Sequence, residues 1–129
     1  MTDRELLEFA AKAAGGLARF DISPDKWPWL QAVVDGKPQP YPVRWNPLTD
    51  DGDALRLAVQ LELSILLRPY RVEVTSWLQT TDVLGFGIPP TPRVKAIEPY
   101  GTDPHTATRR AIVRAAAEIG RSRNELPPQ

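Results

Sequence analysis

The side chains best suited to binding chemistry in this sequence are arginines that stand near aromatic residues. They occur in two groups, one before the middle of the chain and one in its C-terminal quarter. The guanidinium group of arginine holds a phosphate through two parallel hydrogen bonds, and an indole or phenol ring stacks on a base. The pattern therefore predicts a binding site for a small anionic, nucleotide-like ligand. Its predicted residues are Tyr41, Arg44, Trp45, His105, Arg109, Arg110 and Arg114.

His105, the one histidine of the chain, lies in the first turn of a predicted helix, and a helix N-terminus attracts anions. We expect the site to be a pocket between subunits, formed by Tyr41, Arg44, Trp45 and the start of that helix. Each residue also has a purely structural interpretation. His105 can be an exposed or capping residue, and the arginines can form a solvated helix face on which Arg114 pairs with Glu118 one turn later.

Motifs for catalysis, cofactor binding or metal binding are not found. Without cysteine there is no thiol catalysis, and a single histidine does not make a zinc site. Gly85-Phe86-Gly87 lacks the remaining glycine of a dinucleotide loop, and no P-loop or nucleophile-elbow motif occurs. Asp51 and Asp53 resemble the start of a calcium loop, but Leu55 and Arg56 stand where an oxygen ligand and a glycine are needed. We therefore expect no catalytic residue, no cofactor and no metal, in a protein that is not an enzyme.

The charge and length of the chain restrict its partners and its organisation. Its 129 residues contain 16 Lys+Arg and 16 Asp+Glu, so the balanced charge gives no reason to expect nucleic acid or an anionic membrane as partner. No apolar run approaches the roughly 20 residues of a membrane span. The acidic N-terminus is not typical of a signal peptide, and we expect a cytoplasmic protein. The length predicts one domain over 1–120, followed by a flexible C-terminal tail over 121–129.

Three amphipathic helices are predicted to position the candidate residues. They span 2–14, 50–61 and 103–120, and the second can also run on to 66. The first opens with the capping-box spacing of Thr2 and Glu5. Thr49 or Asp50 caps the second by accepting a free backbone N–H, and Gly120 ends the third.

Alternating apolar residues predict four short strands, over 17–22, 63–67, 72–78 and 93–98. Five prolines predict that 23–44 is irregular apart from a turn at Asp35-Gly36, and we expect 79–92 to be a long surface loop, mobile in part. Trp27-Pro28-Trp29 either covers the sheet edge or the second helix, or forms a stacking platform for a planar ligand. Most links between strands are too short for parallel crossovers. We therefore expect an α/β (α+β) fold, an α–β–α sandwich in which three helices pack on a small, largely antiparallel sheet.

Three blocks of the chain resemble a known family. They are DRELLEFAAKAAG (3–15), WNPLTDDGDALRLA (45–58) and ATRRAIVRAAAEIG (107–120). In sequence, order and spacing these blocks are similar to small bacteriophage proteins with the phage ABA sandwich domain. The resemblance implies an α–β–α sandwich from a phage or prophage. It implies no settled activity, so no catalytic residue is carried over.

Together these features predict a phage-encoded, non-catalytic accessory protein that acts in the cytoplasm of the infected bacterial host. It is expected to bind and sequester a small nucleotide-type signalling molecule of host antiviral defence, as a homo-oligomer. A second hypothesis is an interaction module that modulates a host or phage protein through 79–92 and Trp27-Pro28-Trp29. A third is a hydrolase of a nucleotide signal with a hidden site that includes His105.

Overall fold

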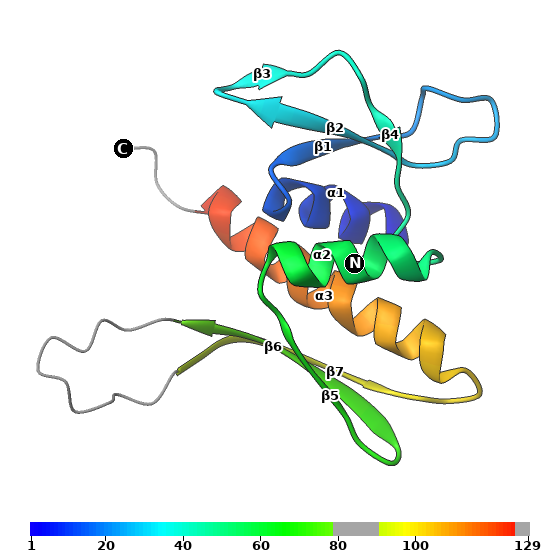
Figure 1. Cartoon of the computed structure of the whole chain (residues 1–129), viewed down its shortest axis with the longest axis vertical. Coiled ribbons are helices and arrows are strands. Elements are labelled where there is room, and N and C mark those ends of the chain that lie inside the picture. Colours follow the sequence, from blue (N-terminus) through cyan, green and yellow to red (C-terminus); the bar gives the residue numbers. More distant parts are fainter. Residues whose placement is uncertain (79–90, 126–129) are drawn as a thin grey trace, which may run out of the picture.

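Three helices lie between two small antiparallel sheets in residues 1–78 and 91–125, the part of the chain that the computed structural model describes (Figure 1). The helices are α1 (Asp3–Ala13), α2 (Asp51–Gln60) and α3 (Pro104–Glu125). The first sheet contains β1 (Gly16–Arg19), β2 (Trp29–Val34), β3 (Lys37–Pro38) and β4 (Val43–Arg44). The second contains β5 (Ser64–Leu67), β6 (Arg71–Leu78) and β7 (Thr91–Pro99). The predicted loop over 79–92 lies outside the described residues except for its last two, which belong to β7.

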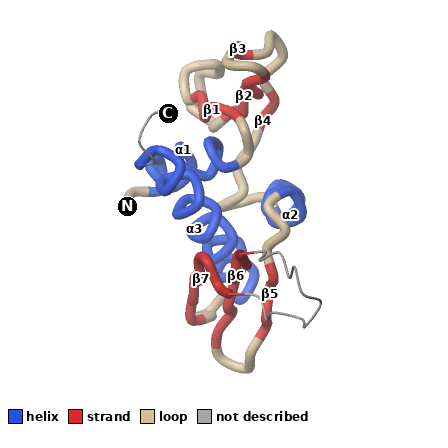
Figure 2. Tube along the Cα trace, turned by 90° about the vertical axis from the view of Figure 1, so that its left-hand side faces the viewer, coloured by secondary structure: helices blue, strands red, loops and turns tan. Residues whose placement is uncertain are grey.

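The predicted α+β class and the antiparallel pairing of strands are confirmed. The order of the layers differs from the expected single sheet between helices. The strands form two sheets at opposite ends of the molecule, and the helices occupy the middle (Figure 2). Alternation of apolar residues shows which face of a strand is buried, but it does not show which strands pair.

The helix N-termini form where the sequence predicts them. The reciprocal hydrogen bonds of the capping box between Thr2 and Glu5 are both present at α1. The side chain of Asp50 caps α2 by accepting from the backbone N–H of Asp53 at 2.8 Å. Asp103 precedes α3 and accepts from the backbone N–H two residues later at 3.0 Å. Each acidic side chain therefore stands at the positive end of a helix dipole.

The predicted end of the last helix at Gly120 is wrong. α3 continues to Glu125, so the boundary predicted between a domain and a tail falls inside a helix, and 126–129 lie outside the described residues. Gly120 instead permits a close crossing of α1 and α3, because a Cβ atom at this position would lie 1.9 Å from the carbonyl oxygen of Phe9. Glycine is the residue type both for helix ends and for such close approaches, so the sequence alone does not separate the two roles.

The segment 23–44, predicted to be irregular, supplies most of the first sheet, and that prediction is wrong. β2 pairs with β1, β3 and β4. The prolines fall before, between or at the ends of these strands, where they remove few ladder hydrogen bonds. Asp35 and Gly36 form the predicted turn, with φ angles of 51° and 77° that suit a two-residue hairpin. The strand predicted over 17–22 begins one residue earlier and already ends at Arg19.

The strands predicted over 63–67, 72–78 and 93–98 are confirmed as β5, β6 and β7. α2 ends at Gln60, so the alternative in which it runs on to 66 does not apply. One face of this second sheet packs on the helices, where Val72 and Val74 of β6 are fully buried. They meet the small side chains of α3 and Leu57 of α2, which form one core cluster with them. None of the helices in the described ranges is long and apolar enough to cross a membrane.

Candidate functional site

The seven residues of the predicted binding site do not meet in one place within the chain. Tyr41 lies between β3 and β4 with 87% of its surface exposed, whereas Trp45 is 6% exposed and belongs to the core. Segment 41–45 adjoins the first sheet, whereas the start of α3 follows β7 of the second sheet (Figure 2). The expected pocket between residues 41–45 and α3 is therefore not formed by one copy of the described chain.

Arg44 belongs to a polar and aromatic cluster beside the first sheet. Its guanidinium pairs with the Asp25 carboxylate at 3.1 Å and lies 4.9 Å from the ring centroid of Trp27 and 5.8 Å from that of Trp29. The Trp29 indole N–H donates to the Ser23 hydroxyl oxygen at 3.1 Å. The two indoles therefore pack with an arginine of the same chain, which favours their structural interpretation over a free stacking platform.

Asp25→Asn is expected to lower the melting temperature at neutral pH, and the difference from the wild type should shrink toward pH 2. Hydrogen bonds from Ser23, from the backbone N–H of Trp27 and from Arg44 lower the pKa of Asp25 from 3.8 to about 2. The folded state thus favours the charged carboxylate. Its contribution to stability is complete well above pH 3.8 and is lost as the pH falls through 2.

Thermal unfolding of both proteins from pH 7 to pH 2 measures this difference. The control is Asp35→Asn, because Asp35 is an exposed turn residue with no ion pair in the described part of the chain. A difference for Asp25→Asn that stays constant down to pH 2 would contradict the assignment.

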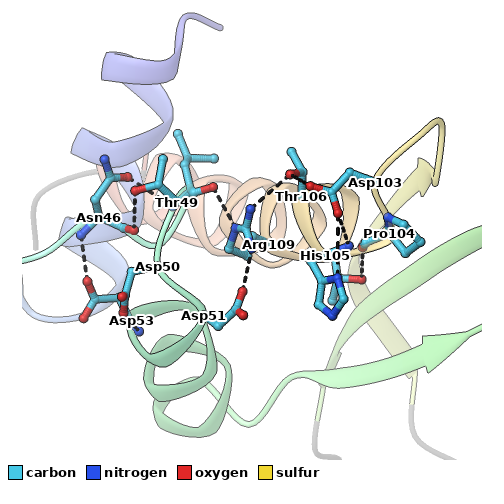
Figure 3. A network of polar contacts seen from close by, with 12 residues as sticks. Asn46, Thr49, Asp50, Asp51, Asp53, Asp103, Pro104, His105, Thr106 and Arg109 are labelled. Carbon is cyan, nitrogen blue, oxygen red and sulfur yellow. Dashed lines mark hydrogen bonds and ion pairs between the residues drawn. The ribbon is translucent and has the colours of Figure 1, made fainter.

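Arg109 joins α3 to the start of α2 (Figure 3). Its guanidinium donates to the Leu48 carbonyl oxygen at 3.0 Å, to the Asp51 carboxylate at 2.6 Å and to the Thr106 hydroxyl oxygen at 3.0 Å. The side chain is 16% exposed. Because Asp51 already balances its charge, an anionic ligand must compete with that carboxylate to bind Arg109.

The other acidic residues of the central stretch are also engaged in structure. Asp53 accepts from the backbone N–H of Asn46 at 2.9 Å and pairs with Arg56 at 2.7 Å, as Figure 3 shows in part. Asp50 caps the helix. Among the described residues, no group of three or more histidine and carboxylate side chains is arranged to hold a metal ion. Capping and ion pairing therefore account for this acidic cluster.

Arg110 and Arg114 lie on another side of α3, toward β7. Arg110 pairs with Asp3 at 3.1 Å and lies 3.8 Å from Glu98. Arg114 donates to the Glu98 carboxylate at 2.7 Å and to the Ile97 carbonyl oxygen at 3.1 Å. The alternative pairing of Arg114 with Glu118 is not formed. Both arginines hold α3 against α1 and β7, and neither faces the start of α3.

An apolar hollow of about 510 Å³ opens between α2, β5 and the first half of α3. This volume lies in the range of small-molecule pockets. Its walls are formed by Ala54, Leu55, Ile65, Leu67, Tyr100 and Ile112. Of the seven predicted site residues, only His105 and Arg109 line it. The sequence shows the wall residues as ordinary core positions, and nothing in their spacing indicates that they surround a shared cavity.

The polar groups of the apolar hollow lie along α3 and at the start of α2. His105 is exposed, with its Nδ1 atom 3.7 Å from the Asp103 carboxylate. The Thr108 hydroxyl donates to the Pro104 carbonyl oxygen at 2.8 Å. The Thr108 hydroxyl and the His105 imidazole therefore do not form a nucleophile–base pair with each other. The hollow can therefore enclose an apolar body and offer hydrogen bonds to a polar group at one side.

A cluster that sequence reasoning missed lies on the outer face of the second sheet. The Glu73 carboxylate is 6% exposed and has Arg68 at 2.7 Å, Lys95 at 3.2 Å and Arg71 at 3.8 Å. Hydrogen bonds from Arg68 and Lys95 lower the pKa of Glu73. Alternation predicts an exposed Glu73, and its burial follows from cross-strand neighbours that the local sequence does not show.

Comparison with protein-family models, with curated proteins and with solved structures gives no match for the chain. The resemblance to the phage ABA sandwich family therefore stays a prediction from the sequence. What the chain can do has to be argued from its own geometry. Hollows of about 400 Å³ also lie beside Arg110 and Arg114 and beside Arg44 and Trp45, but the apolar hollow joins a volume of about 510 Å³ and apolar walls to polar groups at one side.

Proposed function

We propose that this protein is a non-catalytic binding protein that holds a small ligand in the apolar hollow. The observation that carries the proposal is the combination of a volume of about 510 Å³, apolar walls and polar groups concentrated along α3. Binding sites for small molecules have this composition, with apolar walls for affinity and few polar groups for orientation.

The finer proposal is a phage-encoded accessory protein that sequesters a nucleotide-type signalling molecule in the cytoplasm of the infected bacterium, as a homo-oligomer. A planar base suits the apolar walls, and the imidazole of His105 at the side of the hollow can donate a hydrogen bond to a phosphate. Arg109 shares its charge with Asp51, so the hollow favours a ligand with one phosphate over a polyphosphate. Sequestration needs affinity and no chemistry.

Thr108→Trp is expected to abolish ligand binding, because Thr108 lines the hollow and an indole at this position would fill it. Two measurements test this: mass spectrometry of material released from the denatured protein, and thermal shifts with cyclic nucleotides and ADP-ribose derivatives. Wild-type protein should carry or bind a compound that Thr108→Trp does not.

The matched control is Thr102→Trp, an exposed turn residue outside the hollow, which should bind like the wild type. The proposal fails if the wild type releases no compound and shifts with none of the ligands, or if Thr108→Trp binds as well as the wild type.

An interaction module that modulates a host or phage protein is the second candidate function. Exposed apolar side chains at and beside the rim of the hollow favour it, namely Leu55, Val59 and Leu67. Apolar side chains grouped at a surface are typical of protein contacts. A purified host protein that binds the wild type but not Leu55→Arg, with no small molecule released from either, would favour this candidate.

A further inference from the structure

β5 is an edge strand of the second sheet, and its outward N–H and C=O groups have no hydrogen-bond partner strand among the described residues. β5 bonds to β6 on one side only, and all four of its residues are exposed. The backbone N–H of Arg68 donates to the Arg71 carbonyl oxygen at 2.9 Å, which makes this a hydrogen-bonded pair of the ladder. Because such pairs alternate in an antiparallel ladder, the N–H and C=O groups of Ile65 and Leu67 point away from β6.

The opposite edge of the same sheet is protected against further pairing. β7 contains Pro92 and Pro99, which cannot donate to another strand. The guanidinium of Arg114 in α3 donates a hydrogen bond to the outward carbonyl oxygen of Ile97 at 3.1 Å. β5 has no proline and no charged residue between Ser64 and Leu67. Proteins commonly block edge strands with prolines and charges, so the contrast marks β5 as an edge available for pairing.

The charges next to β5 favour a second copy of the same strand in antiparallel orientation. Glu62, which precedes β5, is exposed and has no ion pair in the described residues. Arg68, which follows β5, is half-exposed and shares the one carboxylate of Glu73 with Arg71 and Lys95, so this end of β5 keeps an excess of positive charge. Antiparallel pairing of two identical strands brings the acidic end of each toward the basic end of the other. Parallel pairing would place like charges side by side.

The apolar surface beside the edge fits the same partner. In an antiparallel pair related by a two-fold axis, the helices of both copies lie on the same face of the joined sheet. The exposed side chains Leu55 and Val59 of α2 and Leu67 of β5 then face their equivalents near the axis. Contact there removes apolar surface from water, which stabilises the pair.

We propose that β5 pairs antiparallel with β5 of a second copy, so that two three-stranded sheets join into one of six strands and the partner covers the rim of the apolar hollow. Centring the pair on Leu66 places Ile65 opposite the partner's Leu67, and these residues exchange main-chain hydrogen bonds on both sides of the axis. This inference deepens the homo-oligomer of the proposed function, and it does not depend on the ligand.

Sedimentation of the full chain over a concentration series tests the proposal. The wild type should have twice the monomer mass of 14.4 kDa at tens of micromolar. Ile65→Pro and Leu67→Lys should each raise the dimer dissociation constant at least tenfold, with an unchanged circular dichroism spectrum. The N–H that Ile65→Pro removes points away from β6, so the main-chain hydrogen bonds to β6 stay in place.

Ile97→Lys is the matched control, because it places the same charge at an exposed apolar residue of the other edge strand, and it should dimerise like the wild type. A wild type that stays monomeric at 100 micromolar, or a dimer that neither edge variant weakens, would overturn the proposal.

A cross-link reports whether the two β5 strands lie side by side. The chain has no cysteine, so Leu66→Cys introduces a single thiol, which should form a disulfide with the partner's equivalent residue under mild oxidation. Ile97→Cys should not cross-link at the same concentration. Failure of both Leu66→Cys and Ile65→Cys to cross-link would exclude antiparallel pairing through β5. A wild-type dimer that releases no compound and shifts with none of the ligands would instead contradict the ligand proposal alone.

Discussion

Gly120→Val will lower the free energy of unfolding by about 3 kcal/mol. The Cβ atom would lie 1.9 Å from the carbonyl oxygen of Phe9 and 2.8 Å from its carbonyl carbon, and both are backbone atoms that no change of rotamer can move. α1 and α3 would have to separate, which opens the packing of the buried alanines at their crossing. Urea unfolding followed by circular dichroism measures the loss.

The matched control is Gly52→Ala in α2. Its Cβ would lie 3.2 Å from the flexible end of the Arg56 side chain and from the Asp50 carboxylate, so the change should stay within about 1 kcal/mol. Gly120→Ala introduces the same clashing Cβ atom with a smaller side chain. Its free energy of unfolding can still be measured if Gly120→Val does not fold. If both Gly120 variants are as stable as the wild type, α1 and α3 are not in close contact at Gly120.

Trp45→Ala will destabilise the fold by about 3–5 kcal/mol, because it removes a large buried ring. The side chain is part of the core cluster together with Leu57 of α2, and its backbone N–H donates to the Pro28 carbonyl oxygen at 3.0 Å. This residue was predicted from the sequence to contact ligand. Denaturant unfolding at pH 7 distinguishes the two roles, since a ligand contact at the surface would leave stability nearly unchanged.

Tyr41→Ala is the control for Trp45→Ala, since Tyr41 belongs to the same predicted group but is almost fully exposed. It should change stability by less than about 0.5 kcal/mol. If Trp45→Ala unfolds like the wild type but loses a bound compound, Trp45 contacts ligand and the core assignment is wrong.

Local features of the fold were predictable because their causes lie within a few residues. The capping box at Thr2, the cap at Asp50 and the turn at Asp35-Gly36 depend on neighbours in sequence, and all three are present. The role of Gly120 depends on α1, more than a hundred residues away, and was misassigned. The sheets were predicted as one for the same reason, since pairing depends on tertiary packing.

The candidate site was less predictable than the fold. The type of a residue shows what an arginine can bind, but not whether a carboxylate of the same chain has already bound it. Arg109 meets Asp51, and Arg110 meets Asp3, each across a long stretch of sequence. The walls of the apolar hollow come from α2, β5, α3 and Tyr100 after β7, so no local pattern could indicate them.

The contacts of the first sheet indicate which part of the molecule opens by local unfolding. Among the described elements, β1 is the strand of that sheet with extensive helix contacts, which it makes with α1, and β3 and β4 connect to the rest through β2. Opening of β2–β4 can therefore occur while α3 and β6 keep their core. The two parts should unfold with different free energies. Amide hydrogen exchange should therefore be fast in β2–β4 and slow at Val72 and Val74 of β6.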